Sequence, residues 1–460
     1  MDVDLVRGRL APLVAGRKVV LAGSPLAGLT RTCKRLRELG AERSFLLATG
    51  RGTGPVPEPD QAEQLVIDLP RTSSVIDEIR AALSLIADLP AHALEALDRY
   101  DPDRRALVIA PTFNELTTVA GRRVFGPRLP AWRRLEDKVL VDELWDTLGV
   151  ERAPSAVVPA ETRALRASAR GLDRGAGTAW AGDAREGFNG GATYLRWVRT
   201  PDDEAEAGAF LAAHCDRARV MPFLEGIPCS IHGIVFPDGV TVLRPVEMVT
   251  LRPPGSSRLR YCGAATFWDP PDADREAMRA LARRVGAGLR ARVGYRGGFT
   301  IDGVLAEEGF LPTELNSRFG AGLGTIGRSL PDLPLELLNA ALVEGERLDV
   351  PWHGIEALLL EAADATRAGG AWTFTDRPGD AEHRLLLDAG AWRLATGAEQ
   401  AAATLTLGPS NLGGFVRLDL DPARVAPGPA VAPLAAGAFA FADRELGTDL
   451  GPLEPARAVR

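Results

Sequence analysis

A stretch in the second half of the chain pairs two strand-like runs around a short acidic turn that ends in glycine. The runs, residues 299–305 and 310–316, are rich in β-branched and apolar side chains, which predicts an antiparallel hairpin. Side chains alternate between the two faces of a strand. Asp302 is therefore expected near Glu314, and Asn316 is expected on the same face as Glu314.

This hairpin has the donors of a metal site. Two carboxylates and an amide oxygen on rigid strands suit Mg²⁺ or Mn²⁺, with substrate phosphates completing the coordination. Arg318 would follow on the same face if the strand continued, beside an anion bound to the metal. The alternative is a surface hairpin that happens to carry two acids, and the spacing alone leaves that alternative open.

Lysine is rare in this chain. Lys18, Lys34 and Lys138 are its only lysines among 54 basic residues, so the other basic positions are arginine. A lysine that persists against this preference indicates a need for a compact ammonium group. Lys138 lies in residues 135–145, whose pattern predicts an amphipathic helix that Gly149 stops. The alternative for Lys138 is an exposed helix lysine.

Residues 182–191 are rich in glycine and lie between two expected strands, residues 178–181 and 192–198. Glycine lets backbone N–H groups approach phosphate oxygens closely. The alternative is a long flexible hairpin loop. The candidate phosphate contacts in this loop are Gly187, Asn189, Gly190 and Gly191.

In chain order, Asp302 followed by Glu314-x-Asn316-x-Arg318-Phe319-Gly320 resembles the metal-binding strand pair of the ATP-grasp superfamily. Members of that superfamily join a carboxylate to a nucleophile through an acyl-phosphate. The resemblance implies ATP and Mg²⁺ (or Mn²⁺) as cofactors, with the ion on Asp302, Glu314 and Asn316. It also implies that Lys138 reaches the nucleotide phosphates and that the loop of residues 182–191 covers them.

The same resemblance implies an adenine site on the linker between the two halves of the grasp. Met221, Phe223 and Leu224 match that linker, and Glu225 is a candidate for the ribose. The alternative is a plain core strand.

One departure from the family pattern concerns a second lysine on the strand before the glycine-rich loop. Trp180 stands there, so Arg196 or Arg185 would have to supply the charge. With this departure, the chain resembles a subgroup with a pre-ATP-grasp domain that includes the pheganomycin-type peptide ligase.

The fold class expected is α/β and α+β. Strand–helix alternation at the start predicts a Rossmann-like parallel sheet, and the first turn lacks GxGxxG, so a scaffold is favoured over a dinucleotide site. We expect a pre-ATP-grasp domain over 1–130, a two-lobed ATP-grasp core over 131–220 and 221–348 with the metal site in the second lobe, and a small C-terminal α+β domain over 349–460.

Charge, cysteine spacing and hydropathy argue against nucleic-acid and membrane partners and indicate a reducing compartment. A net charge of −7 argues against nonspecific nucleic-acid binding. The four cysteines have no paired spacing, which fits a reducing cytoplasm. The apolar run at residues 431–442 is too short to span a bilayer, so no membrane partner is expected. A homodimer is left open.

The resemblance implies an ATP-dependent carboxylate–amine ligase that forms an amide (peptide) bond through an acyl-phosphate, in natural-product biosynthesis. Its partners would be a small-molecule carboxylate and the amine of an amino acid or peptide. Lys138 and Arg318 would act in catalysis, and Arg296, Arg318 and Arg328 are candidates for the substrate carboxylate. Two alternatives stay open: a small-molecule kinase on the same fold, and a scaffold that has lost its chemistry. The intact metal-ligand set argues against the second.

Overall fold

The computed structural model describes residues 2–187 and 190–459. Its N-terminal sheet is parallel, in the order β3-β2-β1-β4. Buried side chains alternate along β1 and β2, so one face packs on α1 and α2 and the other on α3 and α4. The strands are β1 (Val19–Ser24), β2 (Ser44–Ala48), β3 (Ala62–Val66) and β4 (Leu107–Ile109), and the helices are α1 (Val3–Val14), α2 (Leu26–Glu38), α3 (Val75–Ala87) and α4 (Ala91–Tyr100). The expected Rossmann-like sheet is therefore confirmed.

A short connecting region leads to a small antiparallel sheet in the order β7-β10-β8-β9. Helices α7 and α8 pack on one face of this small sheet. The connecting elements are β5 (Thr118–Val119), β6 (Arg122–Arg123), α5 (Pro130–Arg133), a 3₁₀ turn (Arg134–Glu136) and α6 (Val141–Thr147). The strands of the small sheet are β7 (Ala156–Pro159), β8 (Thr178–Gly182), β9 (Leu195–Val198) and β10 (Arg217–Pro222), and its helices are α7 (Thr162–Leu172) and α8 (Pro201–His214).

The large sheet is antiparallel, with β14-β13-β11-β15-β16 in order, β12 paired to β11 and β22 paired to β13. Its β15–β16 hairpin sets Asp302 opposite Glu314, as expected from the sequence, and Thr300 opposite Asn316. Helix α9 (Asp272–Val293) packs on this sheet. The strands are β11 (Ile227–Val235), β12 (Val240–Val242), β13 (Val246–Arg252), β14 (Arg260–Ala265), β15 (Gly297–Ala306), β16 (Gly309–Asn316) and β22 (Glu454–Pro455).

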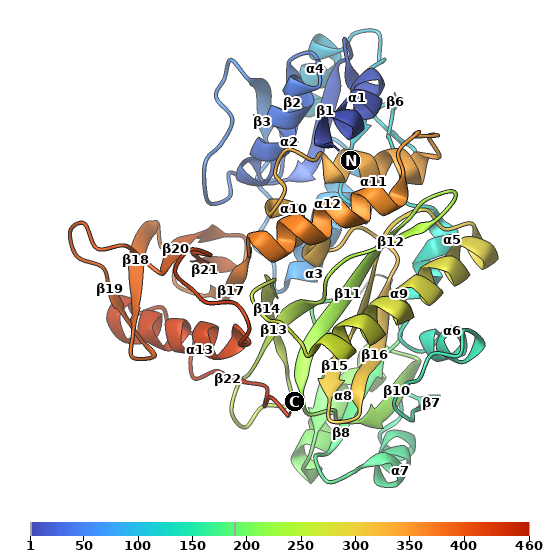
Figure 1. Ribbon diagram of the computed structural model, residues 1–460, viewed down its shortest axis with the longest axis vertical. Coiled ribbons are helices and arrows are strands. Elements are labelled where there is room, and N and C mark those ends of the chain that lie inside the picture. Colours follow the sequence, from blue (N-terminus) through green and yellow to red (C-terminus); the bar gives the residue numbers. More distant parts are fainter. Residues whose placement is uncertain (1, 188–189, 460) are drawn as a thin grey trace.

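Three helices lie between the N-terminal sheet and the large sheet (Figure 1). They are α10 (Ala321–Arg328), α11 (Leu335–Glu344) and α12 (Trp352–Ala365). Their apolar faces share one buried cluster with α1, α2 and the strands β1 and β2. This shared core fixes the N-terminal sheet against the hairpin-bearing part of the chain.

The C-terminal sheet is antiparallel, in the order β17-β21-β20-β18-β19 (Figure 1). Its core includes α13 and residues of β13 and β14, so it is joined to the large sheet by packing. Its elements are β17 (Gly370–Thr375), β18 (Ala381–Asp388), β19 (Ala391–Leu394), β20 (Ala403–Ser410), β21 (Gly413–Leu420) and α13 (Ala432–Phe441), and a π-helical turn (Ala442–Leu446) follows.

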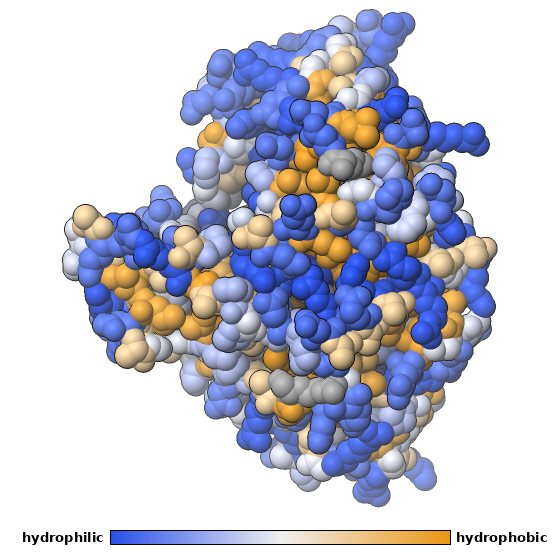
Figure 2. Space-filling view, viewed as in Figure 1, coloured by the Kyte–Doolittle hydropathy of each residue, from blue (hydrophilic) through white to orange (hydrophobic). Residues whose placement is uncertain are grey.

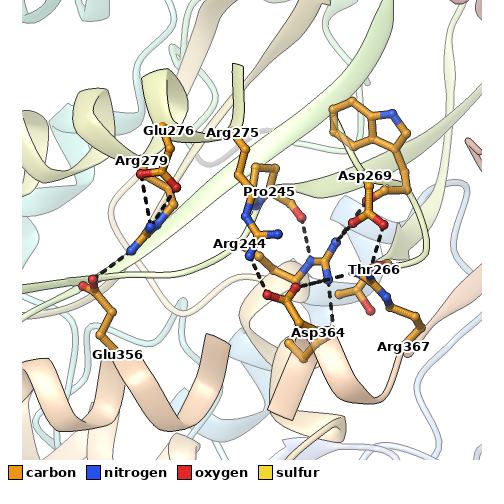
Figure 3. Close-up of polar contacts among 12 residues, drawn as sticks. Arg244, Pro245, Thr266, Asp269, Arg275, Glu276, Arg279, Glu356, Asp364 and Arg367 are labelled. Carbon is orange, nitrogen blue, oxygen red and sulfur yellow. Dashed lines mark hydrogen bonds and ion pairs between the residues drawn. The ribbon is translucent and has the colours of Figure 1, made fainter. Parts of the chain in front are cut away.

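A buried arginine joins α12 to the large sheet. Arg244 is 1% exposed, and it contacts Asp269 and, at 2.6 Å, Asp364 of α12 (Figure 3). Arg367 pairs with the same Asp269 at 2.9 Å, and Arg275 of α9 pairs with Asp364 at 2.6 Å. Two aspartates are thus shared by three arginines, which fixes the angle between α9, α12 and the sheet edge.

The face of the molecule seen in Figure 2 is mainly polar. Figure 2 shows one face covered largely by hydrophilic side chains, with apolar ones in smaller groups among them. Within residues 2–187 and 190–459, every helix is too short or too polar to be a membrane span.

One expectation for the secondary structure was wrong, and one helix was missed. Residues 135–145 do not form one helix, because a turn that includes Lys138 separates the 3₁₀ turn from α6. The Asp137 side chain accepts a hydrogen bond from the backbone of Val139 at 3.1 Å, which stabilises this turn instead of a helix. Helix α12 was not expected from the sequence, and it buries Ile355 and Leu359 at helical spacing.

Candidate functional site

A cavity of about 720 Å³ lies where all four sheet regions approach each other. Strands β8 and β10 of the small sheet and β11, β13, β14, β15 and β16 of the large sheet line most of it. The start of α3 and strand β17 of the C-terminal sheet complete the wall. A volume of this size fits the usual range of small-molecule sites, roughly 300–1,000 Å³.

The β15–β16 hairpin places Asp302, Glu314 and Asn316 on the cavity wall. Ser230 on β11 donates to Asp302 Oδ1 at 2.6 Å, and Asn316 Nδ2 donates to Asp302 Oδ2 at 2.7 Å. Burial, and then the Glu314 carboxylate, raise the pKa of Asp302 to about 7. A buried carboxyl group whose ionisation is opposed by a neighbouring carboxylate favours a cation beside it.

Lys138 forms an ion pair with one of these acids, Glu314. Its Nζ lies 2.7 Å from Glu314 Oε1, and the two side chains are 9% and 20% exposed. The donor set therefore fits a divalent ion that shares the negative charge with Lys138. No cluster of three or more His, Cys, Asp or Glu with metal-binding geometry occurs in the described part of the chain, so Asn316 and oxygens of a bound ligand would have to complete the coordination.

Arg318 also lines the cavity, directly after β16. It forms an ion pair with Glu136 of the 3₁₀ turn, and its guanidinium lies 4.7 Å from the centre of the Phe113 ring. Glu136 pairs in addition with Arg128 at 2.9 Å. Arg318 is thus held at the wall by contacts from the connecting region.

The expected adenine contacts Met221, Phe223 and Leu224 all line the cavity. Glu225 does not. Both of its carboxylate oxygens accept hydrogen bonds from Arg252, at 3.1 Å each. The structure gives Glu225 the task of fixing Arg252, so we do not assign it to a ribose.

The glycine-rich loop reaches the cavity at one end. Gly190 and Gly191 line the cavity and Gly187 does not, while Asn189 lies outside the described residues. Arg80 of α3 donates to the backbone oxygen of Glu186 at 3.3 Å, so the N-terminal unit holds the start of this loop.

The residues named for the missing lysine lie elsewhere. Trp180 is buried in the core of the small sheet, whereas its neighbours Ala179 and Ala181 line the cavity. Arg196 is 3% exposed and lies 3.9 Å from the centre of the Phe210 ring, where it donates to backbone oxygens of residues 193 and 195. Arg185 pairs with Asp216 at 3.3 Å. Arg196 pairs with Trp180 across β8 and β9 and so shares its inward face, and neither Arg196 nor Arg185 lines the cavity.

Arg219 is one of the cavity cations that sequence reasoning missed, and Arg252 and Arg260 are the others. Arg219 lies on β10 opposite Ala181 and lines the cavity. Asp142 holds its Nη1 at 2.9 Å, and its Nη2 donates to the backbone oxygen of Thr313. Alternation was a usable signal, because Arg219 must share a strand face with Met221, two residues later.

Arg296 and Arg328 do not line the cavity. Arg296 precedes β15, at the strand end remote from Asp302, and donates to the backbone oxygen of Val343 at 3.3 Å. Arg328 ends α10 and lies 3.7 Å from Asp419 of β21. Both have structural contacts, so the structure does not place them at a substrate carboxylate.

Comparisons with known proteins find similarity in structure but not in sequence. The sequence matches no family model and no curated protein. Among solved structures, a Campylobacter jejuni biotin carboxylase complex has a TM-score of 0.56 at 12% identity, over 96% of this chain and 92% of that one. The biotin carboxylase domain of Hydrogenobacter thermophilus 2-oxoglutarate carboxylase, solved with MgADP, ADP and bicarbonate, has a TM-score of 0.53 at 13% identity, over 96% and 91%.

A third neighbour is an ADP complex of N5-carboxyaminoimidazole ribonucleotide synthetase, with a TM-score of 0.50 at 11% identity over 94% of this chain and 98% of that one. All three neighbours are ATP-grasp enzymes. At this level of identity the likeness shows the fold: this chain has the ATP-grasp architecture over nearly its whole length.

Proposed function

We propose that this chain is an ATP-grasp ligase that uses ATP and Mg²⁺ to join a carboxylate to an amine and releases ADP. The observation that carries the proposal is the meeting of Asp302, Glu314 and Asn316 on one cavity wall, with Lys138 on Glu314. Two of the solved neighbours support it, since they were solved with ADP, and one of those also with MgADP.

Each group in the cavity then has a task. Asp302, Glu314 and Asn316 would hold Mg²⁺, which neutralises charge on the phosphate oxygens. Lys138 and Arg219 add positive charge beside Glu314, and Met221 and Phe223 offer apolar surface to the adenine. Arg318 would balance the charge that spreads over the transferring phosphoryl oxygens.

The reaction has two steps. A carboxylate oxygen of the first substrate attacks the γ-phosphorus, the bond from that phosphorus to the β–γ bridging oxygen breaks, and ADP leaves with the acyl-phosphate remaining. The amine of the second substrate then attacks the acyl carbon. The carbon–oxygen bond to phosphate breaks, phosphate leaves, and the amine nitrogen gives up a proton to form the amide.

The finer assignment follows the resemblance to pheganomycin-type ligases. We propose a small amino-acid-like carboxylate and the amino group of an amino acid or peptide as substrates, and a role in natural-product biosynthesis. The four domain ranges expected from the sequence are part of the same proposal, with the metal site in the range 221–348.

Product analysis tests the proposal. Purified protein is given ATP, Mg²⁺, a pool of amino acids and short peptides, and carboxylate labelled with heavy oxygen. We expect ADP, phosphate that carries one labelled oxygen, and a product lighter than its two parents by one water. AMP and pyrophosphate would refute the acyl-phosphate route, and a stable phosphorylated alcohol would identify a kinase instead.

A further inference from the structure

Aromatic side chains from two sheets line part of the cavity. Trp372 and Phe374 on β17 and Tyr261 on β14 all line it, and all three are half-buried. The Tyr261 and Trp372 rings are 5.8 Å apart at 85°, and the Trp372 and Phe374 rings are 5.4 Å apart at 69°. These edge-to-face pairs hold one another in place and leave apolar surface open to a ligand.

This aromatic part lies near the proposed metal site. After burial, the Asp302 carboxylate is the next cause that raises the pKa of the Tyr261 hydroxyl. Ile76 and Ile79 of α3 line the same cavity and add aliphatic surface from the N-terminal unit. A ligand that fills this space must carry a large apolar group within reach of the metal site.

One arginine here lacks an acidic partner. Three of the four arginines that line the cavity are paired with acids: Arg219 with Asp142, Arg252 with Glu225 and Arg318 with Glu136. Within residues 2–187 and 190–459, Arg260 forms no ion pair, and its buried Nη1 has no hydrogen-bond partner. Among these four arginines, Arg260 is therefore the one whose charge an anionic group of a ligand can neutralise.

We propose that Arg260, Tyr261, Trp372 and Phe374 form the subsite for the amine substrate, and that this substrate is an aromatic amino acid with a free α-carboxylate. Its side chain would pack among the three rings and its carboxylate would pair with Arg260. The amino group is then the remaining polar group, free to face the metal site. The role of that amine rests on the proposed ligase function, whereas the subsite itself rests on the unpaired arginine and the aromatic wall.

Binding experiments with L-phenylalanine as the probe test the subsite. Calorimetry on the full chain with Mg²⁺ and a non-hydrolysable ATP analogue would compare L-phenylalanine with L-alanine and with L-phenylalaninamide, which lacks the carboxylate. We expect L-phenylalanine to bind at least tenfold more tightly than either. Arg260→Gln should remove the preference for phenylalanine over its amide. Trp372→Leu should lower the affinity for phenylalanine at least fivefold, while Trp372→Phe should retain that affinity.

Arg258→Gln is the matched control, because Arg258 lies two residues away and does not line the cavity. It should bind phenylalanine as the wild type does. Equal binding of phenylalanine and alanine, or an Arg260→Gln variant that still prefers phenylalanine, would overturn the subsite. If the subsite fails this test while the nucleotide analogue binds normally, the ligase proposal still stands. If phenylalanine binds but the nucleotide analogue does not, the ligase proposal is refuted and the subsite is kept.

Discussion

Lys138→Ala should weaken the protein in the absence of Mg²⁺ and strengthen its affinity for Mg²⁺. The lysine ammonium lies 2.7 Å from Glu314, next to Asp302. Without it, two neighbouring carboxylates have no ammonium beside them, so folding loses an ion pair. Mg²⁺ no longer competes with the ammonium for Glu314 in this variant. Its binding free energy should therefore become more favourable by about as much as the folding free energy becomes less favourable.

The burial of the pair sets the size of the effect. Exposed ion pairs contribute about 0–1 kcal/mol, and breaking a fully buried pair costs about 3–5 kcal/mol. With side chains 9% and 20% exposed, this pair falls between those limits, at about 1–3 kcal/mol. The corresponding gain in Mg²⁺ affinity is roughly fivefold to a hundredfold.

Thermal unfolding in chelator and across a Mg²⁺ titration measures both quantities. The variant should unfold at a lower temperature in chelator and recover with Mg²⁺ more than the wild type does. Lys34→Ala is the control, because Lys34 is 78% exposed and lies 4.0 Å from Glu38; it should change neither. If Mg²⁺ protects Lys138→Ala no better than the wild type, the ion is not bound at Glu314. Turnover of ATP should still fall at least about tenfold, and Lys138→Arg should restore it only in part.

Three further changes test other parts of the molecule. Glu314→Gln should reduce ADP formation at least about 100-fold with an unchanged circular dichroism spectrum, because it removes one charged metal ligand; near-normal rates at limiting Mg²⁺ would contradict the site. Arg244→Met should cost about 2–3 kcal/mol of unfolding free energy in denaturant titrations, against less than about 1 kcal/mol for the more exposed Arg275→Met, and equal losses would contradict the buried network. Gly322→Ala should destabilise by about 1–3 kcal/mol, because its Cβ would lie 2.1 Å from His232 Nε2. Adding His232→Ala should recover part of that loss, and strictly additive losses would show that the two side chains do not clash.

The part of the site set by local pairing could be predicted from the sequence. Two strand-like runs joined by a short acidic turn define a hairpin, and period-two alternation then places Asp302 opposite Glu314, as observed. The same rule, applied to β8, would have shown that Ala181 and not Trp180 shares a face with Ala179, since residues 179 and 181 alternate with 180.

The rest depends on contacts between distant segments. Nothing local to β17 shows that Trp372 and Phe374 face a cavity shared with β14, because both faces of that strand carry residues suited to a sheet. The residue type alone also does not show which arginines line the cavity. Arg296 and Arg328 have the same chemistry as Arg219, and only the packed structure shows which of them reaches the cavity and which is used at the surface or in the core.

The division of the cavity wall among separate sheets has a consequence for how such a protein could change over generations. The proposed metal ligands Asp302, Glu314 and Asn316 come from the large sheet, while two of the aromatic rings come from the C-terminal sheet. If the proposed subsite is correct, substitutions at residues 372 and 374 would alter which acceptor is chosen without disturbing Asp302 or Glu314. On the same proposal, a descendant gene, or a chimera that exchanges the segment 370–420, would acquire a new acceptor preference and keep the proposed ATP and Mg²⁺ site.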